Sequence, residues 1–161
     1  MERLAERHRR FTQMGKRRAE TTIERSADDV WATIGRFGSL DWYLNVERCT
    51  LDGRLRTAYM GGMDMEVDEL EVAHDDAART YTYAVVAFRG TTKIDLPDGT
   101  VLDVGPMTNH HTATVTVTPL SDTSSLVTYD VEIDDGYDDM LDSTRGGYQA
   151  VIDALKRDLE Q

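Results

Sequence analysis

The sequence predicts an α+β fold in which a curved antiparallel β-sheet wraps around a long C-terminal helix. From residue 46 onward, apolar and polar residues alternate with a period of two, and turn residues separate the segments. After residue 137 the period becomes that of a helix with one apolar face. Strands joined by short turns are antiparallel, and a one-faced helix that follows such a sheet is expected to cover its concave side.

Composition limits the domain count and the partners. The chain has 161 residues and a formal net charge of −12, which suits one acidic domain. An acidic body repels phosphate backbones, so we expect no nucleic-acid partner. The single Cys49 excludes an internal disulfide and a cysteine-based metal cluster. Because the chain lacks both a membrane-length apolar run and the apolar core of a secretory signal, we expect a cytoplasmic protein.

The N-terminus differs in charge from the rest. Residues 1–20 hold seven basic and three acidic side chains. Leu4, His8, Phe11 and Met14 recur there at helical spacing, but this stripe is thin. We therefore expect a basic N-terminal extension over residues 1–20 and a folded domain over residues 21–161.

The domain is expected to open with a strand and two short helices. Residues 21–25 resemble a strand, and Ser26 with Asp29 resembles a helix N-cap. Residues 30–34 supply the apolar face of the first helix, which Gly35 and Gly38 end. Residues 40–44 are expected to form the second short helix.

Six longer strands are expected next, at residues 46–52, 54–61, 63–73, 79–88, 108–118 and 125–134. Between the fourth and fifth, an insertion at 89–104 contains a hairpin around Pro97-Asp98-Gly99. The alternation slips by one after Asp68, which indicates a β-bulge near residues 68–70.

The chain ends in an amphipathic helix with acidic residues near its start and Lys156 and Arg157 near its end, as the helix dipole favours. Its apolar face comprises Leu141, Thr144, Tyr148, Val151, Ile152, Leu155 and Leu159. Gly146-Gly147 interrupts it, for which we consider close packing, a modest kink or a flexible gate.

Side-chain alternation predicts which residues face the concave side of the sheet. The predicted inward residues are Asn109, His111, Ala113, Val115 and Val117, then Val127, Tyr129, Val131 and Ile133, with Tyr81, Tyr83 and Val85, and with Met63, Met65 and Val67. The acidic residues between them, such as Asp64 and Glu132, then face solvent, so paired-carboxylate catalysis and metal binding are not expected. The polar members of the inward set form either a hydrogen-bonded core network or part of a ligand pocket.

The inward polar groups could host acid–base chemistry. His111 is the only inward histidine and could act as a general base. Tyr129, Tyr83 or Tyr59 could hold an enolate or carbonyl oxygen, and Asn109 could orient His111 or a substrate. This set suits cyclisation or dehydration of a poly-β-ketone, with His111 and Tyr129 as catalytic residues, and it suits ligand orientation equally well. No phosphate-binding glycine loop or serine nucleophile elbow is present.

Several segments, in their order along the chain, resemble the START-like (SRPBCC) superfamily, and within it the polyketide cyclase/dehydrase and lipid transport family. They are residues 23–31 (Ile-Glu-Arg-Ser-Ala-Asp-Asp-Val-Trp), 40–42 (Leu-Asp-Trp), 81–85 (Tyr-Thr-Tyr-Ala-Val), 105–107 (Gly-Pro-Met) leading into 109–113, and 125–129 (Ser-Leu-Val-Thr-Tyr). The resemblance covers about residues 21–160. His111 departs from it, because the family often carries an aromatic residue there, and so does the insertion at 89–104.

The resemblance implies a helix-grip fold with a cavity between the sheet and the C-terminal helix. It implies binding of a hydrophobic small molecule that is lipid-, polyketide- or quinone-like, as a carrier or sensor. The alternative is a polyketide cyclase or dehydratase that uses His111 as base. A third hypothesis is an interaction module built on the insertion and the basic N-terminus. The sequence gives no reason to expect a metal or a cofactor, and it leaves a homodimer open.

Alternation and resemblance together nominate a set of ligand-binding side chains. They are Trp42, Tyr59, Met63, Met65, Tyr81, Tyr83, Asn109, His111, Tyr129 and Tyr148.

Overall fold

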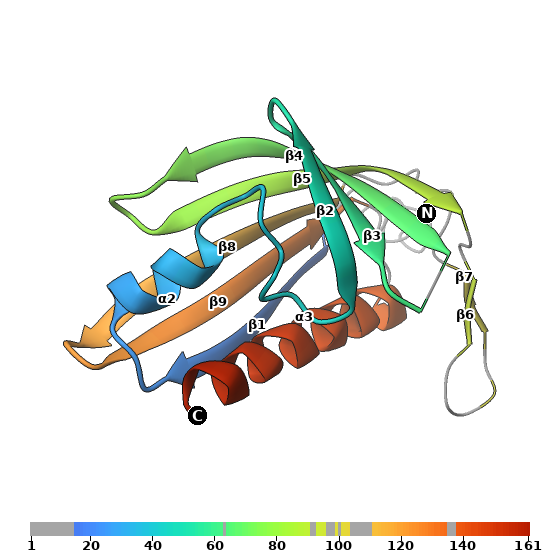
Figure 1. Cartoon of the computed structure of the whole chain (residues 1–161). Coiled ribbons are helices and arrows are strands. Elements are labelled where there is room, and N and C mark those ends of the chain that lie inside the picture. Colours follow the sequence, from blue (N-terminus) through green and yellow to red (C-terminus); the bar gives the residue numbers. More distant parts are fainter. Residues whose placement is uncertain are drawn as a thin grey trace, which may run out of the picture.

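The computed structural model describes residues 15–62, 64–90, 93–95, 99, 101–103, 111–134 and 138–161. Seven strands form one antiparallel sheet in the order β1-β9-β8-β5-β4-β3-β2, and β6 and β7 pair separately. The elements are β1 (Gly15–Ile23), α2 (Ala27–Ile34), β2 (Val46–Asp52), β3 (Leu55–Met60), β4 (Met65–Asp75), β5 (Thr80–Gly90), β6 (Lys93–Asp95), β7 (Val101–Asp103), β8 (His111–Ser121), β9 (Ser124–Ile133) and α3 (Asp138–Leu159). The curved sheet and C-terminal helix of the predicted helix-grip fold are therefore confirmed (Figure 1).

The first strand begins earlier than predicted. β1 starts at Gly15 and not at Thr21, so residues 15–20 of the expected extension belong to the sheet. Ala19 is buried in the core opposite Tyr129. Arg17 is one of the basic residues that suggested an extension. It forms salt bridges with Asp138 and Asp142 of α3, at 2.9 Å each. The predicted helical stripe at residues 4–14 lies outside the described residues.

Only the first of the two predicted short helices is present among the described residues. In α2 the Ser26 hydroxyl accepts a hydrogen bond from the Asp29 backbone N–H at 3.1 Å, as expected of an N-cap. Residues 40–44 form turns instead of a second helix. The Tyr43 N–H donates to the Leu40 carbonyl at 2.9 Å, and Asn45 with a φ of 65° then redirects the chain into β2.

The predicted bulge is present, but the extra residue lies on the neighbouring strand. Asp68 pairs with Ala87 and Glu69 with Val85, so Val86 of β5 is unpaired. β4 keeps its alternation from Met65 to Glu69, so Glu69 faces inward with Met65 and Val67, and a second irregularity between Glu71 and Ala73 leaves Val72 unpaired. Leu70, whose apolar character suggested the slip, is exposed.

The C-terminal helix rests on one side of the sheet. α3 packs chiefly on β1 and to a smaller extent on β9 (Figure 1). Its buried residues are Leu141, Tyr148, Val151, Ile152 and Leu155, all of them predicted. Within the part of the chain that the structure describes, no helix is long and apolar enough to cross a membrane.

A charged pair lies inside the core between β3 and β4. Arg56 is fully buried, and its Nε donates to Glu69 Oε1 at 2.7 Å while its Nη1 donates to the Phe37 carbonyl at 3.0 Å. The guanidinium carbon lies 4.1 Å from the centre of the Phe37 ring and 4.6 Å from that of Tyr83. The pair thus connects the sheet to the loop that follows α2.

We predict strong coupling between the two members of this pair. Arg56→Met should reduce the free energy of unfolding by about 3–5 kcal/mol, because it leaves a buried carboxylate without its cation. Adding Glu69→Leu should recover part of that loss, since an apolar pair replaces the stranded charge. Urea unfolding of both single variants and the double variant measures the coupling, and strictly additive costs would contradict it.

Candidate functional site

A cavity of about 190 Å³ lies between α3 and the inner face of the sheet. Side chains of β3, β4, β5 and β8, the turns before β2, and the first half of α3 line it. The lining residues are Leu40, Tyr43, Val46, Ala58, Met60, Met65, Val67, Glu69, Val85, Phe88, His111, Thr144, Gly147 and Tyr148. The β5 bulge allows both Val85 and Phe88 to face this space, although they are three positions apart.

A chain of hydroxyl groups leads from the cavity into the core. Tyr148 OH lies 3.3 Å from His111 Nε2, and Tyr83 OH donates to Tyr148 OH at 3.1 Å. Tyr83 OH is also 3.3 Å from Tyr129 OH, and the Tyr129 ring stacks on that of Tyr148 with centroids 4.2 Å apart. The network satisfies buried phenols that would otherwise be costly, and it fixes Tyr148 and His111 at the cavity wall.

Burial determines the charge of His111. The residue is only 7% exposed, and desolvation lowers its pKa from 6.5 to about 4. The imidazole is therefore neutral at neutral pH. Its Nε2 can accept a hydrogen bond from the Tyr148 hydroxyl, whose own pKa burial raises above the ordinary value.

Among the described residues, Glu69 is the only acidic side chain that lines the cavity. It is 8% exposed, and burial raises its pKa while the neighbouring Arg56 opposes that rise. Arg56 donates to Oε1, and no described residue donates to Oε2. Glu69 thus adds a hydrogen-bond acceptor to a lining that is otherwise mostly apolar.

The structure brings three of the nominated residues into the cavity wall: Met65, His111 and Tyr148. Tyr83 and Tyr129 lie behind Tyr148, fully buried, and do not line the cavity. Their role is therefore to support Tyr148.

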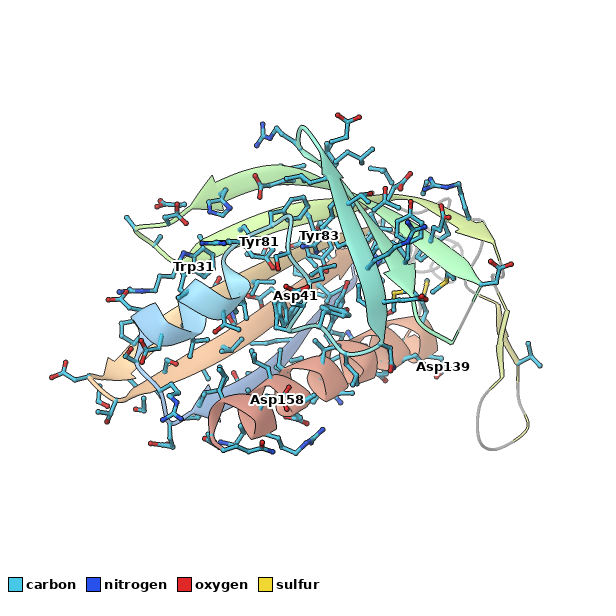
Figure 2. The ribbon with its side chains drawn as sticks, in the orientation of Figure 1. Trp31, Asp41, Tyr81, Tyr83, Asp139 and Asp158 are labelled. Atoms are coloured by element: carbon cyan, nitrogen blue, oxygen red, sulfur yellow. The ribbon has the colours of Figure 1, made fainter. Side chains whose placement is uncertain are left out.

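Three nominated residues lie elsewhere, and two lie outside the described residues. Tyr81 packs with Trp31 and Tyr83 at the α2 end of the concave face (Figure 2). Trp42 is buried against Tyr43 beside the cavity, without lining it. Tyr59 does not line the cavity: the buried positions of β3 are Arg56 and Ala58, and Tyr59 lies under the Arg48 guanidinium at 3.7 Å. Met63 and Asn109 lie outside the described residues.

Sequence reasoning missed several lining residues, of which Glu69, Tyr43 and Gly147 matter most chemically. The apolar Leu70 and Val72 indicated the opposite parity for this part of β4, so no sequence signal favoured Glu69. Tyr43 was assigned to a helix that is absent. Among the described side chains, no three His, Cys, Asp or Glu residues are grouped to hold a metal ion.

The lowered pKa of His111 predicts a pH dependence of stability. Between pH 6.5 and 4 the unfolded chain binds a proton at this residue and the native state does not, so stability falls as the pH drops through this window. The loss attributable to His111 should reach roughly 3 kcal/mol. Urea unfolding of the wild type and His111→Gln at pH 7 and at lower pH tests this. Equal pH slopes for the two proteins would show that His111 is not desolvated.

Comparison with solved structures shows the same fold elsewhere. A protein from Bacillus thuringiensis has a TM-score of 0.73 and 23% identity, with 91% of this chain and 100% of that chain covered. A START superfamily protein from Mycobacterium smegmatis has a TM-score of 0.65 and 11% identity, covering 92% and 99%. Norcoclaurine synthase from Thalictrum flavum, in complex with dopamine and hydroxybenzaldehyde, has a TM-score of 0.61 and 17% identity, covering 91% and 87%.

Sequence comparison identifies the family. No curated protein matches the chain significantly. The family model described as polyketide cyclase / dehydrase and lipid transport, however, matches residues 14–160, and its start agrees with the start of β1 at Gly15. Because that match covers nearly the whole chain, this chain belongs to the polyketide cyclase / dehydrase and lipid transport family.

Proposed function

We propose that the protein binds a hydrophobic small molecule in the cavity between α3 and the sheet. The observation that carries this proposal is the lining itself: aliphatic, methionine and phenylalanine side chains surround a few fixed polar groups, His111, Tyr148 and Glu69. That composition is typical of small-molecule sites, in which apolar contacts give affinity and the polar groups orient the ligand.

The family supports the same conclusion at a coarser level. Its description joins lipid transport with cyclase and dehydrase activity, and both require an apolar molecule to be held. Norcoclaurine synthase, which has the same fold, was solved with two small aromatic compounds.

The pKa of His111 and the position of Tyr129 both favour binding over catalysis. A general base works best when its pKa lies near the working pH, and that of His111 is about 4. Tyr129, the second catalytic candidate, lies behind Tyr148 and does not line the cavity. A polyketide cyclase or dehydratase with His111 as base is the alternative. A cytoplasmic location and a homodimer stay predictions from the sequence.

Cavity filling tests the proposal. Ala58 is buried and lines the cavity, whereas Ala73 lies exposed on β4. Native mass spectrometry and calorimetry should show one molecule of toluene, para-cresol, octanoate or a naphthoquinone bound per chain. Ala58→Leu should weaken that binding by about tenfold or more, because the added atoms occupy the site, a loss of roughly 1.4 kcal/mol or more.

Ala73→Leu provides the matched control, since it makes the same chemical change at an exposed position, and it should leave binding unchanged. Failure of the wild type to bind any of the four compounds would contradict the proposal. Equal effects of the two substitutions would place the binding elsewhere.

A further inference from the structure

Two adjacent glycines lie in the middle of α3, although glycine destabilises a helix interior relative to alanine. Neither Gly146 nor Gly147 has a positive φ, so backbone conformation does not require glycine at either position. No described atom lies within 4 Å of a Cβ placed on either residue, so close packing against the described residues does not require it. The helix also continues through both residues from Asp138 to Leu159. A side chain at either position would therefore enter open space among the described residues, and its effect depends on where that space lies.

The two positions differ in one respect. Gly147 lines the cavity and Gly146 does not. Gly147 is also exposed, so it lies where the cavity meets solvent. Thr144, one turn earlier on the same face, is the neighbouring lining residue, and its hydroxyl donates to the Met140 carbonyl of its own helix at 2.8 Å. At the exposed edge of the cavity, α3 therefore contributes Gly147, which has no side chain, and Thr144, whose hydroxyl is already hydrogen-bonded.

The cavity volume limits the size of the ligand that the cavity can enclose. About 190 Å³ is less than the roughly 300–1,000 Å³ of sites for drug-sized ligands. It is similar to the apolar cavity of about 150 Å³ that is known to accept benzene. The space therefore fits a compact molecule of one or two rings and is too small to enclose a long acyl chain.

We propose that Gly147 is the residue that admits the ligand to this cavity, and that the ligand is a compact molecule of one or two aromatic rings. This inference rests on the proposed function. Gly147 lies at the exposed edge of the cavity, so a side chain at this position would narrow the opening through which a flat ring enters. Gly146 does not line the cavity, so a side chain at that position would not narrow the opening.

The experiment compares Gly147→Ala and Gly147→Leu with the matched controls Gly146→Ala and Gly146→Leu. Calorimetry with para-cresol and with naphthol measures affinity, and thermal unfolding checks the fold. Both alanine variants should unfold at higher temperature than the wild type, because each gains helix propensity. The wild type should bind both compounds, because each is smaller than the cavity. Gly147→Leu should weaken para-cresol binding by about tenfold or more, while both Gly146 variants keep wild-type affinity.

The remaining outcomes separate this inference from the proposed function. The wild type could bind para-cresol while Gly147→Leu and Gly146→Leu change that binding equally. This result would overturn the role of Gly147 but leave the cavity as a binding site. Binding of octanoate without binding of either ring compound would overturn the proposed ligand class. Absence of binding by either probe and by the wider set of compounds would overturn both proposals together.

Discussion

The position of α3 is the constraint on which the site depends. The helix packs along β1 and the adjoining β9, while the sheet curves over it (Figure 1). β3, β4 and β5 therefore present apolar side chains to a space that the helix does not fill. Tyr148 extends from α3 into this space and contacts the sheet through Tyr83 and His111. The cavity is what remains between the helix and the far strands.

Burying polar groups is costly unless they are paired. The protein pairs many of them, although Trp42 Nε1, Arg56 Nη2 and Tyr81 OH have no hydrogen-bond partner among the described residues. Tyr83, Tyr129, Tyr148 and His111 share one hydrogen-bonded chain. Arg56 is compensated by Glu69, by the Phe37 carbonyl and by aromatic faces. The polar atoms that face the cavity are consequently held in fixed positions, which is the condition for orienting a ligand.

The sequence predicted the sheet well because one face of each strand is buried, and burial gives alternation a clear direction. The inward stripes of β8 and β9, including His111 and Tyr129, are buried as predicted. β1 was placed too late because Arg17 and Arg18 resembled a solvated tail, whereas their charges are paired with acids distant in sequence. Glu69 was missed because the bulge beside it lies on β5 and not on β4. Which of two paired strands carries a bulge depends on how they pair and not on local sequence. The ring stacking that places Tyr129 behind Tyr148 likewise appears only in three dimensions.

A crystal structure under xenon pressure tests the central claim most directly, because xenon enters apolar cavities without needing polar contacts. The account predicts xenon density among Met65, Val85 and Tyr148, with the sheet and α3 unmoved. Side chains that fill this space, or xenon found only at other sites, would contradict it.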